Sequence, residues 1–313
     1  MERLFNMQKT FHENLHGKLD NLTTLEREDI TKVLALAMHQ EVSALAETIH
    51  YKSHHTRKAD PDLNNLVYES VDIIRYAIAI MNTWDVCPER FLEAYNDKGA
   101  YLNLTQQLEK KKWEGQPVVI IDMDDVIVEF RSNFSKWLKK EFDVDADIAS
   151  SEYYFIDALR KTGHNPETVF IDFLNNVGFK RLTRVIGMSE AIRELRNKGY
   201  WLHILTARPE ENLRCKYDTY AWILNNNLMI DRISFSTEKF RWCANSQYYD
   251  TNSIVCAIDD SPKHATEYAK HGLPVLLPVM PYNQNLAIET NIHYYTEPQQ
   301  IIQFKVEYRY LSK

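Results

Sequence analysis

The feature that most constrains the fold is a change of sequence pattern at residues 113–117, WEGQP. Before this point, apolar residues recur at the three- and four-residue spacing of amphipathic helices. After it, short apolar runs alternate with helical segments, as they do in a parallel sheet whose strands are joined by helices. The sequence therefore predicts an all-α domain over residues 1–112, a linker at 113–117 and an α/β domain over 118–313.

The N-terminal domain is expected to be a bundle of amphipathic helices. Apolar spacing predicts two long helices around residues 34–49 and 67–81, separated by a polar loop that contains Asp-Pro-Asp. A further helix is expected over about 88–98, followed by another that ends near the basic cluster at 110–112, since basic residues suit a helix C-terminus.

The C-terminal domain is expected to be a doubly wound parallel sheet. Its predicted buried strands are the apolar runs at 118–122, 201–206, 232–235, 254–259 and 274–277. Helices over 189–198 and about 263–271 each end before a glycine, as is common at a helix C-terminus. Residues 130–185 interrupt the alternation with helical sequence and predict a small inserted cap.

Glycine is scarce, and its spacing excludes one way of binding phosphate. The chain has only eight glycines in 313 residues, and no two of them fit G-x-G-x-x-G or the Walker A pattern. Any bound phosphate must therefore be held by other groups.

Polar side chains follow the predicted strands, where ligands bind in open parallel sheets. Asp122 and Asp124 follow the first strand, and they share one face because side chains two residues apart in an extended segment point the same way. The other strand ends contribute Thr206, Lys239, Asp259 and Asp260. Carboxylates gathered at one edge repel unless a cation is present, and hard oxygen ligands of this kind suit Mg²⁺.

These motifs carry a family resemblance over residues 118–283. The order of four motifs resembles that of the haloacid dehalogenase (HAD) superfamily of phosphotransferases. These motifs are D-x-D-x-V after a strand, an apolar run ending in Thr, a Lys, and a strand ending in Asp-Asp. Three of the segments around these motifs resemble the 5′(3′)-deoxyribonucleotidases: Thr-Glu-Lys at 237–239, IDDSPK at 258–263 and Pro-Tyr-Asn at 281–283. The implied architecture is a Rossmann-like sheet with a cap, and the implied activity is hydrolysis of a phosphate monoester.

The resemblance implies a role for each motif residue. Asp122 would attack phosphorus and form an aspartyl-phosphate, and Asp124 would act as general acid and then base. Thr206 and Lys239 would hold the phosphoryl oxygens. The residues implied to hold Mg²⁺ are Asp122, Asp124 through its backbone carbonyl, Asp259 and, beside them, Asp260.

Several alternatives remain open within this domain. Lys263 is an alternative to Lys239 as the lysine that holds the phosphoryl oxygens. Asp125 lies where the nucleotidases often have Gly, which weakens the inference that the substrate is a nucleotide. Phe130 and the other aromatic residues of the cap either form a surface that binds a nucleobase or belong to an ordinary hydrophobic core. Ala207 and Arg208 are also candidates for substrate binding. They lie in the segment TARPEE, which also resembles polynucleotide-kinase phosphatase domains. That resemblance implies a 3′-phosphorylated nucleic-acid end as an alternative substrate.

The helical domain has its own candidate metal ligands. Glu69 and Asp72 lie three residues apart on one helical face, and Glu41 lies on the preceding helix. The segments around them resemble the all-α nucleoside triphosphate pyrophosphohydrolases, the MazG-like and dimeric dUTPase group, in which carboxylates bind Mg²⁺ that activates water. One ligand position holds Ala44 instead of Glu. The resemblance implies Lys52 and Lys98 as substrate-binding residues and a homodimer formed through these helices.

Together the two resemblances predict a Mg²⁺-dependent enzyme that converts NTP to NMP and then NMP to nucleoside and phosphate. The cysteine usage predicts that it is cytoplasmic. The alternatives are a polynucleotide 3′-phosphatase and a nucleotidase whose helical domain only binds nucleotide or dimerises. A net charge of −7 argues against nucleic acid as a partner. The lack of a long apolar stretch argues against a membrane, and four widely spaced cysteines suit a reducing compartment.

Overall fold

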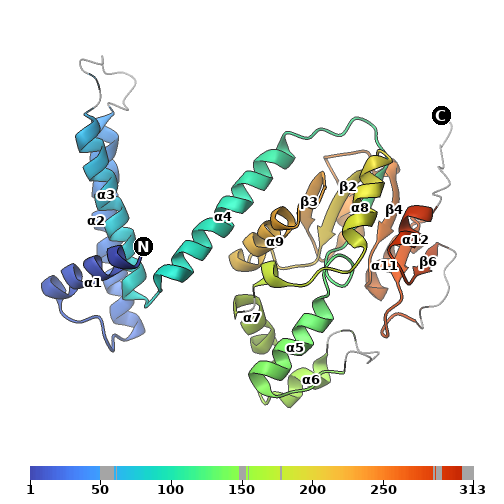
Figure 1. The fold of residues 1–313 in the computed structure, drawn as a ribbon, viewed down its shortest axis with the longest axis horizontal. Helices are drawn as coiled ribbons and strands as arrows, with labels where there is room; N and C mark the ends of the chain where they lie inside the picture. The colour runs from blue at the N-terminus through green and yellow to red at the C-terminus, as the bar shows by residue number, and fades with distance from the viewer. Residues whose placement is uncertain are drawn as a thin grey trace. The chain divides into compact units, whose positions relative to one another are not determined.

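The structure is a computed structural model that describes residues 1–49, 60, 62–147, 153, 155–176, 178–284, 286 and 291–304. The chain forms two compact units, Met1–Asn96 and Asp97–Lys313 (Figure 1). The division between them falls inside a helix, α4, and precedes the linker expected at 113–117. The boundary between the functional domains therefore stays a prediction. No helix among the described residues is long and apolar enough to cross a membrane.

The first unit is all-α, as expected. Helices α2 and α3 pack along each other, and α1 packs against α3. Thr23 and Glu26 form a capping box at the start of α2, and the Asp62 carboxylate caps α3 by accepting from two backbone N–H groups. The helix expected after the polar loop therefore begins directly after Asp62. The helices of this unit are α1 (Glu2–His16), α2 (Thr24–Thr48), α3 (Leu63–Thr83) and the first turns of α4 (Pro88–Glu109).

Helix α4 corrects the expectation of two helices between residues 88 and 112. It is continuous over Pro88–Glu109 and runs through Gly99. A single glycine costs a helix only about 1 kcal/mol. Tertiary contacts offset this cost, because Leu104 and Leu108 are buried in the core of the second unit, and Asp97 pairs with Lys180 at 2.6 Å.

The second unit contains a six-stranded parallel sheet with the order β3-β2-β1-β4-β5-β6. The five predicted strands are present. The sixth was not predicted, because in IHYY only the end residues are buried and the segment does not form a buried apolar run. The strands are β1 (Val118–Ile121), β2 (Trp201–Thr206), β3 (Arg232–Phe235), β4 (Ile254–Ile258), β5 (Val275–Pro278) and β6 (Ile292–Tyr295).

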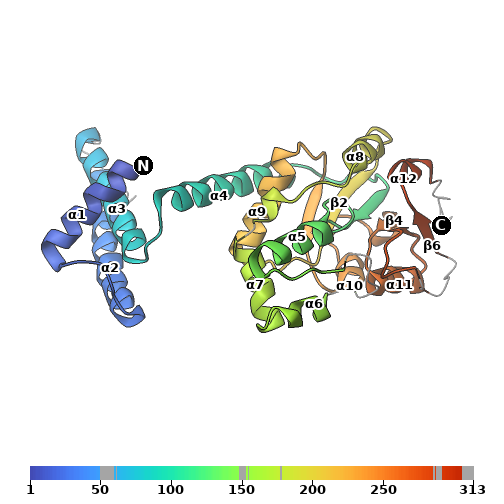
Figure 2. The same ribbon diagram turned by 60° about the horizontal axis from the view of Figure 1, so that its bottom comes forward.

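Helices cover both faces of this sheet (Figure 2). Alternate strand residues such as Leu202 and Ile204 join one core with α8, α9, α12 and the end of α4. Trp201 and Leu205 face the other core, with α10 and α11. The helices are α8 (Met188–Asn197), α9 (Leu213–Asn225), α10 (Lys239–Ala244), α11 (Pro262–Lys270) and α12 (Gln299–Gln303), with a short 3₁₀ turn, η2 (Thr251–Ser253).

The expected helical insert lies between β1 and α8. Its elements are α5 (Phe130–Phe142), α6 (Ile156–Lys161), α7 (Pro166–Asn176) and the 3₁₀ turn η1 (Phe179–Arg181). The doubly wound sheet with a small helical cap therefore confirms the predicted fold class. Strand β1 lies between β2 and β4, where the winding of the sheet reverses. Ligands bind outside the carboxyl ends of the strands at such a point.

Candidate functional site

Three carboxylates meet at the carboxyl ends of β1 and β4. Asp122 follows β1, and Asp259 and Asp260 follow β4. One oxygen of each lies within 4.8 Å of the others. All three are buried, with exposed fractions of 6%, 1% and 2%. The residues predicted from strand ends therefore converge at the reversal point of the sheet.

Lys239 places a positive charge between two of these carboxylates. Its Nζ lies 2.7 Å from Asp122 Oδ1 and 2.7 Å from Asp259 Oδ2, and the side chain is 1% exposed. Burial disfavours the ammonium, but the two carboxylates outweigh it and raise the pKa of Lys239. The competing candidate, Lys263, is exposed. The geometry therefore favours Lys239.

The cluster retains more negative than positive charge. Burial raises the pKa of Asp122 to about 6; Lys239 opposes this rise, and Asp259 and Asp124 add to it. Burial and the charge of Asp122 raise the pKa of Asp260 well above its usual value. Among the described residues, Asp260 Oδ1 is buried without a hydrogen-bond partner, although Tyr282 donates to the other oxygen. A set of hard oxygen donors with an unsatisfied buried member fits Mg²⁺.

Asp124 does not join the carboxylate cluster through its side chain. Arg208 donates to both of its oxygens, at 2.6 Å from Nη2 and 2.9 Å from Nε. The guanidinium also donates to Thr219 and lies 4.1 Å from the ring centroid of Phe179 in the cap. Arg208 therefore fixes Asp124 by a bidentate, charge-assisted contact.

The end of β2 lies beside this ion pair. Thr206 is fully buried, and its hydroxyl accepts from the Arg208 backbone N–H at 3.3 Å. Ala207 is exposed. The substrate-binding roles of Thr206, Ala207 and Arg208 stay predictions.

The sequence analysis missed a buried cation at the junction of cap and sheet. The Arg131 guanidinium carbon lies 3.9 Å from the Phe155 ring centroid and 4.7 Å from that of Tyr282. The Arg131 backbone N–H donates to Asp125, which adopts a left-handed φ of 54°. Burial raises the pKa of Asp125 to about 7. The only sequence signal was the Pro-Tyr-Asn motif, which contains Tyr282 but does not indicate its partner.

Phe130 belongs to a cluster of aromatic rings in the cap. Its ring centroid lies 5.6 Å from Phe173, 5.7 Å from Phe134 and 6.2 Å from Phe179. This packing is that of a hydrophobic core, and Phe130 itself is half-buried. A contact between Phe130 and a nucleobase stays a prediction.

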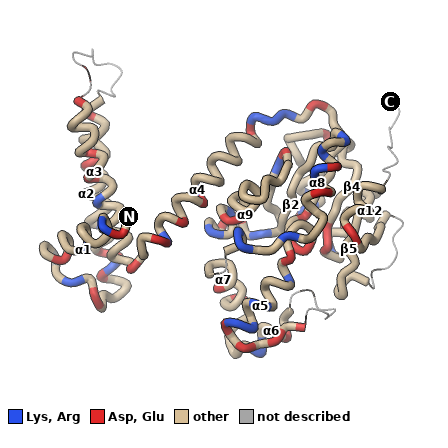
Figure 3. The backbone as a smooth tube through the Cα atoms, in the orientation of Figure 1, with Lys and Arg blue, Asp and Glu red and all other residues tan. Residues whose placement is uncertain are grey.

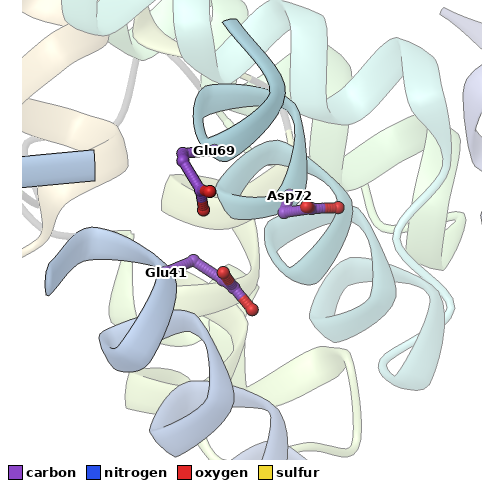
Figure 4. Close-up of side chains that lie close together, drawn as sticks. All are labelled: Glu41, Glu69 and Asp72. Atoms are coloured by element: carbon purple, nitrogen blue, oxygen red, sulfur yellow. The ribbon is translucent and has the colours of Figure 1, made fainter. Parts of the chain in front are cut away.

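A second carboxylate cluster lies in the helical unit. Glu41 extends from α2 toward Glu69 and Asp72 on α3 (Figure 4), and one oxygen of each lies within 4.8 Å of the others. All three side chains are half-buried. Burial raises the pKa of Glu41, and the charges of Asp72 and Glu69 raise it further. Such mutual repulsion is relieved by a cation, so these oxygens also fit Mg²⁺.

The rest of the predicted helical site is less complete. Ala44 is half-buried on α2 and offers no ligand atom, while Glu47 is exposed and outside the cluster. Lys98 is an exposed residue of α4. Lys52 lies outside the described residues. The substrate-binding roles of the two lysines stay predictions.

Comparison with known proteins gives one family and several similar folds. A family model described as dUTPase matches residues 1–170. No curated protein matches the chain. Residues 171–313, which contain Thr206, Lys239 and Asp259, lie beyond the matched region.

Solved structures resemble part of the chain at low identity. A predicted phosphatase from Clostridium acetobutylicum is 15% identical with a TM-score of 0.44, and the match covers 60% of this chain and 99% of that one. The D,D-heptose 1,7-bisphosphate phosphatase of Burkholderia thailandensis is 13% identical with a TM-score of 0.37, covering 60% and 97%. A dehalogenase is 11% identical with a TM-score of 0.43, covering 62% and 99%.

Replacing Lys239 is expected to destabilise the second unit. In Lys239→Met, Asp122 and Asp259 lose their shared cation, and leaving buried charge uncompensated costs about 3–5 kcal/mol. Denaturant unfolding with EDTA measures this loss. Added Mg²⁺ should raise the melting temperature more in Lys239→Met than in the unmutated protein. The exposed Lys263→Met is the matched control, expected to change stability by less than about 0.5 kcal/mol. Equal losses in both variants would contradict the bridging role of Lys239.

Proposed function

The chain belongs to the dUTPase family, whose model covers residues 1–170, and on that premise we propose that the protein is a Mg²⁺-dependent nucleotide hydrolase with two active sites. The observation that carries the proposal is the convergence of two separate carboxylate clusters, each with a donor set that suits Mg²⁺. The helical site hydrolyses a nucleoside triphosphate, and the site at the sheet hydrolyses a phosphate monoester.

At the sheet, Asp122 is the nucleophile. One of its carboxylate oxygens bonds to phosphorus as the bond from phosphorus to the ester oxygen breaks, which gives an aspartyl-phosphate. Asp124 donates a proton to the leaving oxygen, then accepts one from the water that releases phosphate and regenerates Asp122. For both proton transfers, Asp124 must release its ion pair with Arg208, which occupies both carboxylate oxygens. Lys239 and Thr206 hold the phosphoryl oxygens.

A Mg²⁺ ion at the sheet would be held by Asp122, Asp259, Asp260 and the backbone carbonyl of Asp124. A bound Mg²⁺ would neutralise charge on the phosphoryl oxygens during transfer. The burial of these carboxylates supports this role, because electrostatic interactions are stronger where water is excluded.

The proposed substrate is a nucleoside monophosphate, released as nucleoside and phosphate. The sequences at 237–239, 258–263 and 281–283 support this class through their resemblance to deoxyribonucleotidases. The alternative is a 3′-phosphorylated nucleic-acid end, which the position of Arg208 in TARPEE favours. The charge pattern opposes it, since Lys and Arg are interspersed with Asp and Glu along the chain (Figure 3).

In the helical unit, Glu41, Glu69 and Asp72 would hold Mg²⁺, and the chemistry such an ion would supply is activation of a water molecule for attack on the α-phosphorus. The family suggests dUTP as the first substrate to test, with dUMP and pyrophosphate as products. The second site would convert dUMP to deoxyuridine and phosphate. The competing view is that Ala44, in place of a fourth ligand, leaves a domain that binds nucleotide or dimerises without catalysis.

A homodimer through the helical unit is part of the proposal. Among the described residues of this unit, more large apolar side chains are exposed than buried. They form a stripe on α1 and recur along α2 and α3: Leu4, Met7, Phe11, Leu15, Val33, Leu36, Val67, Val71 and Ile74. Apolar surface of this extent marks an interface. The cytoplasm is the proposed compartment, since the four cysteines are free.

Asp122→Asn is expected to abolish phosphate release from nucleoside monophosphates and to leave the fold intact, because an amide cannot act as the nucleophile. Asp124→Asn should lower the turnover rate about 10²–10⁴-fold. Phosphate release and circular dichroism measure the two effects. Glu211→Gln, at an exposed carboxylate about three positions after Arg208 in the sequence, is the control and should retain activity. Undiminished turnover in Asp122→Asn would exclude Asp122 as the nucleophile.

The helical site is tested in the full-length Asp122→Asn protein, where pyrophosphate release from dUTP and the common NTPs reports this site alone. Glu69→Gln should abolish that release, and Ala44→Glu should lower the Mg²⁺ concentration needed for half-maximal rate by adding a ligand. Glu47→Gln, an exposed carboxylate on the same helix, is the control. No pyrophosphate from any nucleotide would favour the non-catalytic alternative.

The proposed dimer is tested by light scattering on the full chain. Val33→Glu with Leu36→Glu places two charges on an apolar face of α2 and should give a monomer with unchanged helix content. Lys32→Glu, an exposed polar position on the same helix, should remain dimeric. An unmutated protein that is monomeric at micromolar concentration would contradict the proposal.

A further inference from the structure

The loop after β5 contacts one of the buried carboxylates at the sheet in two places. Residues 281–283, Pro-Tyr-Asn, lie against Asp260, which follows β4. The Tyr282 hydroxyl donates to Asp260 Oδ2 at 2.5 Å, and the Asn283 side-chain amide donates to the Asp260 backbone carbonyl at 3.1 Å. The loop therefore holds both the side chain and the main chain of this proposed Mg²⁺ ligand.

The loop itself is fixed to the sheet through Asn283, which is fully buried. The amide nitrogen of Asn283 also donates to the Pro278 backbone carbonyl, at the end of β5, at 2.9 Å. The side-chain oxygen accepts from the Met280 backbone N–H at 3.0 Å, and the backbone carbonyl accepts from the Tyr294 hydroxyl of β6 at 2.8 Å. These contacts to two strands give the neighbouring Tyr282 a defined position.

The hydrogen bond from Tyr282 determines which oxygen of Asp260 is available to an ion. Tyr282 occupies Oδ2, whereas Oδ1 is buried without a hydrogen-bond partner among the described residues. A carboxylate that binds a metal is commonly oriented by a hydrogen bond from a neighbouring residue. The contact at Oδ2 therefore restrains the carboxylate from turning and leaves Oδ1 for Mg²⁺.

The ring of Tyr282 packs against the cap. The Arg131 guanidinium of α5 lies 4.7 Å from the Tyr282 ring centroid and 3.9 Å from that of Phe155. The Tyr153 ring meets Tyr282 edge to face, with centroids 5.0 Å apart. Arg131 is 6% exposed, and a cation–π contact is stronger where water is excluded. One phenol therefore joins the cap to the carboxylate cluster.

From these contacts we infer that Tyr282 is a positioning residue for Asp260, and that Arg131 fixes the Tyr282 ring so that the packing of the cap sets the affinity for Mg²⁺. The inference rests on the proposed function in one respect, because that proposal makes Asp260 a ligand of the ion. The contacts from Arg131 to Tyr282 and from Tyr282 to Asp260 do not depend on which phosphate monoester is hydrolysed.

The experiment measures Mg²⁺ binding by calorimetry to full-length Glu69→Gln, the parent protein, in which the helical cluster lacks one carboxylate and contributes little. Tyr282→Phe in this parent keeps the ring and deletes only the hydroxyl. Its Kd for Mg²⁺ should rise about 10–100-fold, as when a hydrogen-bond partner of a metal ligand is removed. The Mg²⁺ concentration for half-maximal phosphate release should rise in parallel, while the rate at saturating Mg²⁺ is retained.

Tyr249→Phe is the matched control, because it also deletes a buried phenol hydroxyl, one that lies 2.6 Å from His203 Nδ1. It should leave the Kd unchanged. Melting in EDTA separates stability from binding: a lower melting temperature with an unchanged Kd in Tyr282→Phe would overturn the inference. No saturable Mg²⁺ binding by the parent would overturn it together with the proposed metal site. Saturable binding without phosphate release would contradict the proposed function alone.

A double-mutant cycle tests the part of Arg131. Arg131→Met removes the cation over the ring and should raise the Kd less than Tyr282→Phe does, whereas Arg131→Lys keeps a cation there and should bring the Kd back toward the parent value. Because Arg131 acts through Tyr282, adding Arg131→Met to Tyr282→Phe should raise the Kd by less than the product of the two separate effects. An unchanged Kd in Arg131→Met, or fully independent effects, would overturn the link between cap and metal site.

Discussion

The second unit depends on one buried ammonium group. Lys239 lies between Asp122 and Asp259, and it comes from the segment after β3 while its partners follow β1 and β4. Two buried carboxylates this close would repel without a cation, and moving an ion from water into a protein interior costs several kcal/mol. The contact therefore joins three strand ends and keeps nucleophile and proposed metal ligands in one small volume.

The two carboxylate clusters show different solutions to the same repulsion. At the sheet, burial is nearly complete and the protein supplies its own cation. In the helical unit, the carboxylates are half-buried, and the nearest described ion pair is the looser one between Asp72 and Arg75, at 3.5 Å. The helical site therefore relies more on a bound ion, and the absence of a ligand at Ala44 has more effect there.

Local patterns predicted the sheet and the carboxylates, because strand burial and strand-end placement follow from short segments such as VVIID and IVCAID. They did not predict contacts made only in the folded chain. The ion pair of Asp124 with Arg208 joins residues 84 positions apart, and the ring contacts of Arg131 join the cap to the loop after β5. The continuity of α4 was missed because tertiary packing of Leu104 outweighs a local glycine.

Helix α4 carries residues of both units without a break, and this limits where the chain tolerates a change of length. An inserted residue turns all following helical positions by about 100°. An insertion near Gly99 would therefore take Leu104 and Leu108 out of the core that they share with α9, while Asp97 stayed with Lys180. We therefore expect the fold to tolerate insertions and deletions after Glu109, in the segment that leads to β1, but not within the helix.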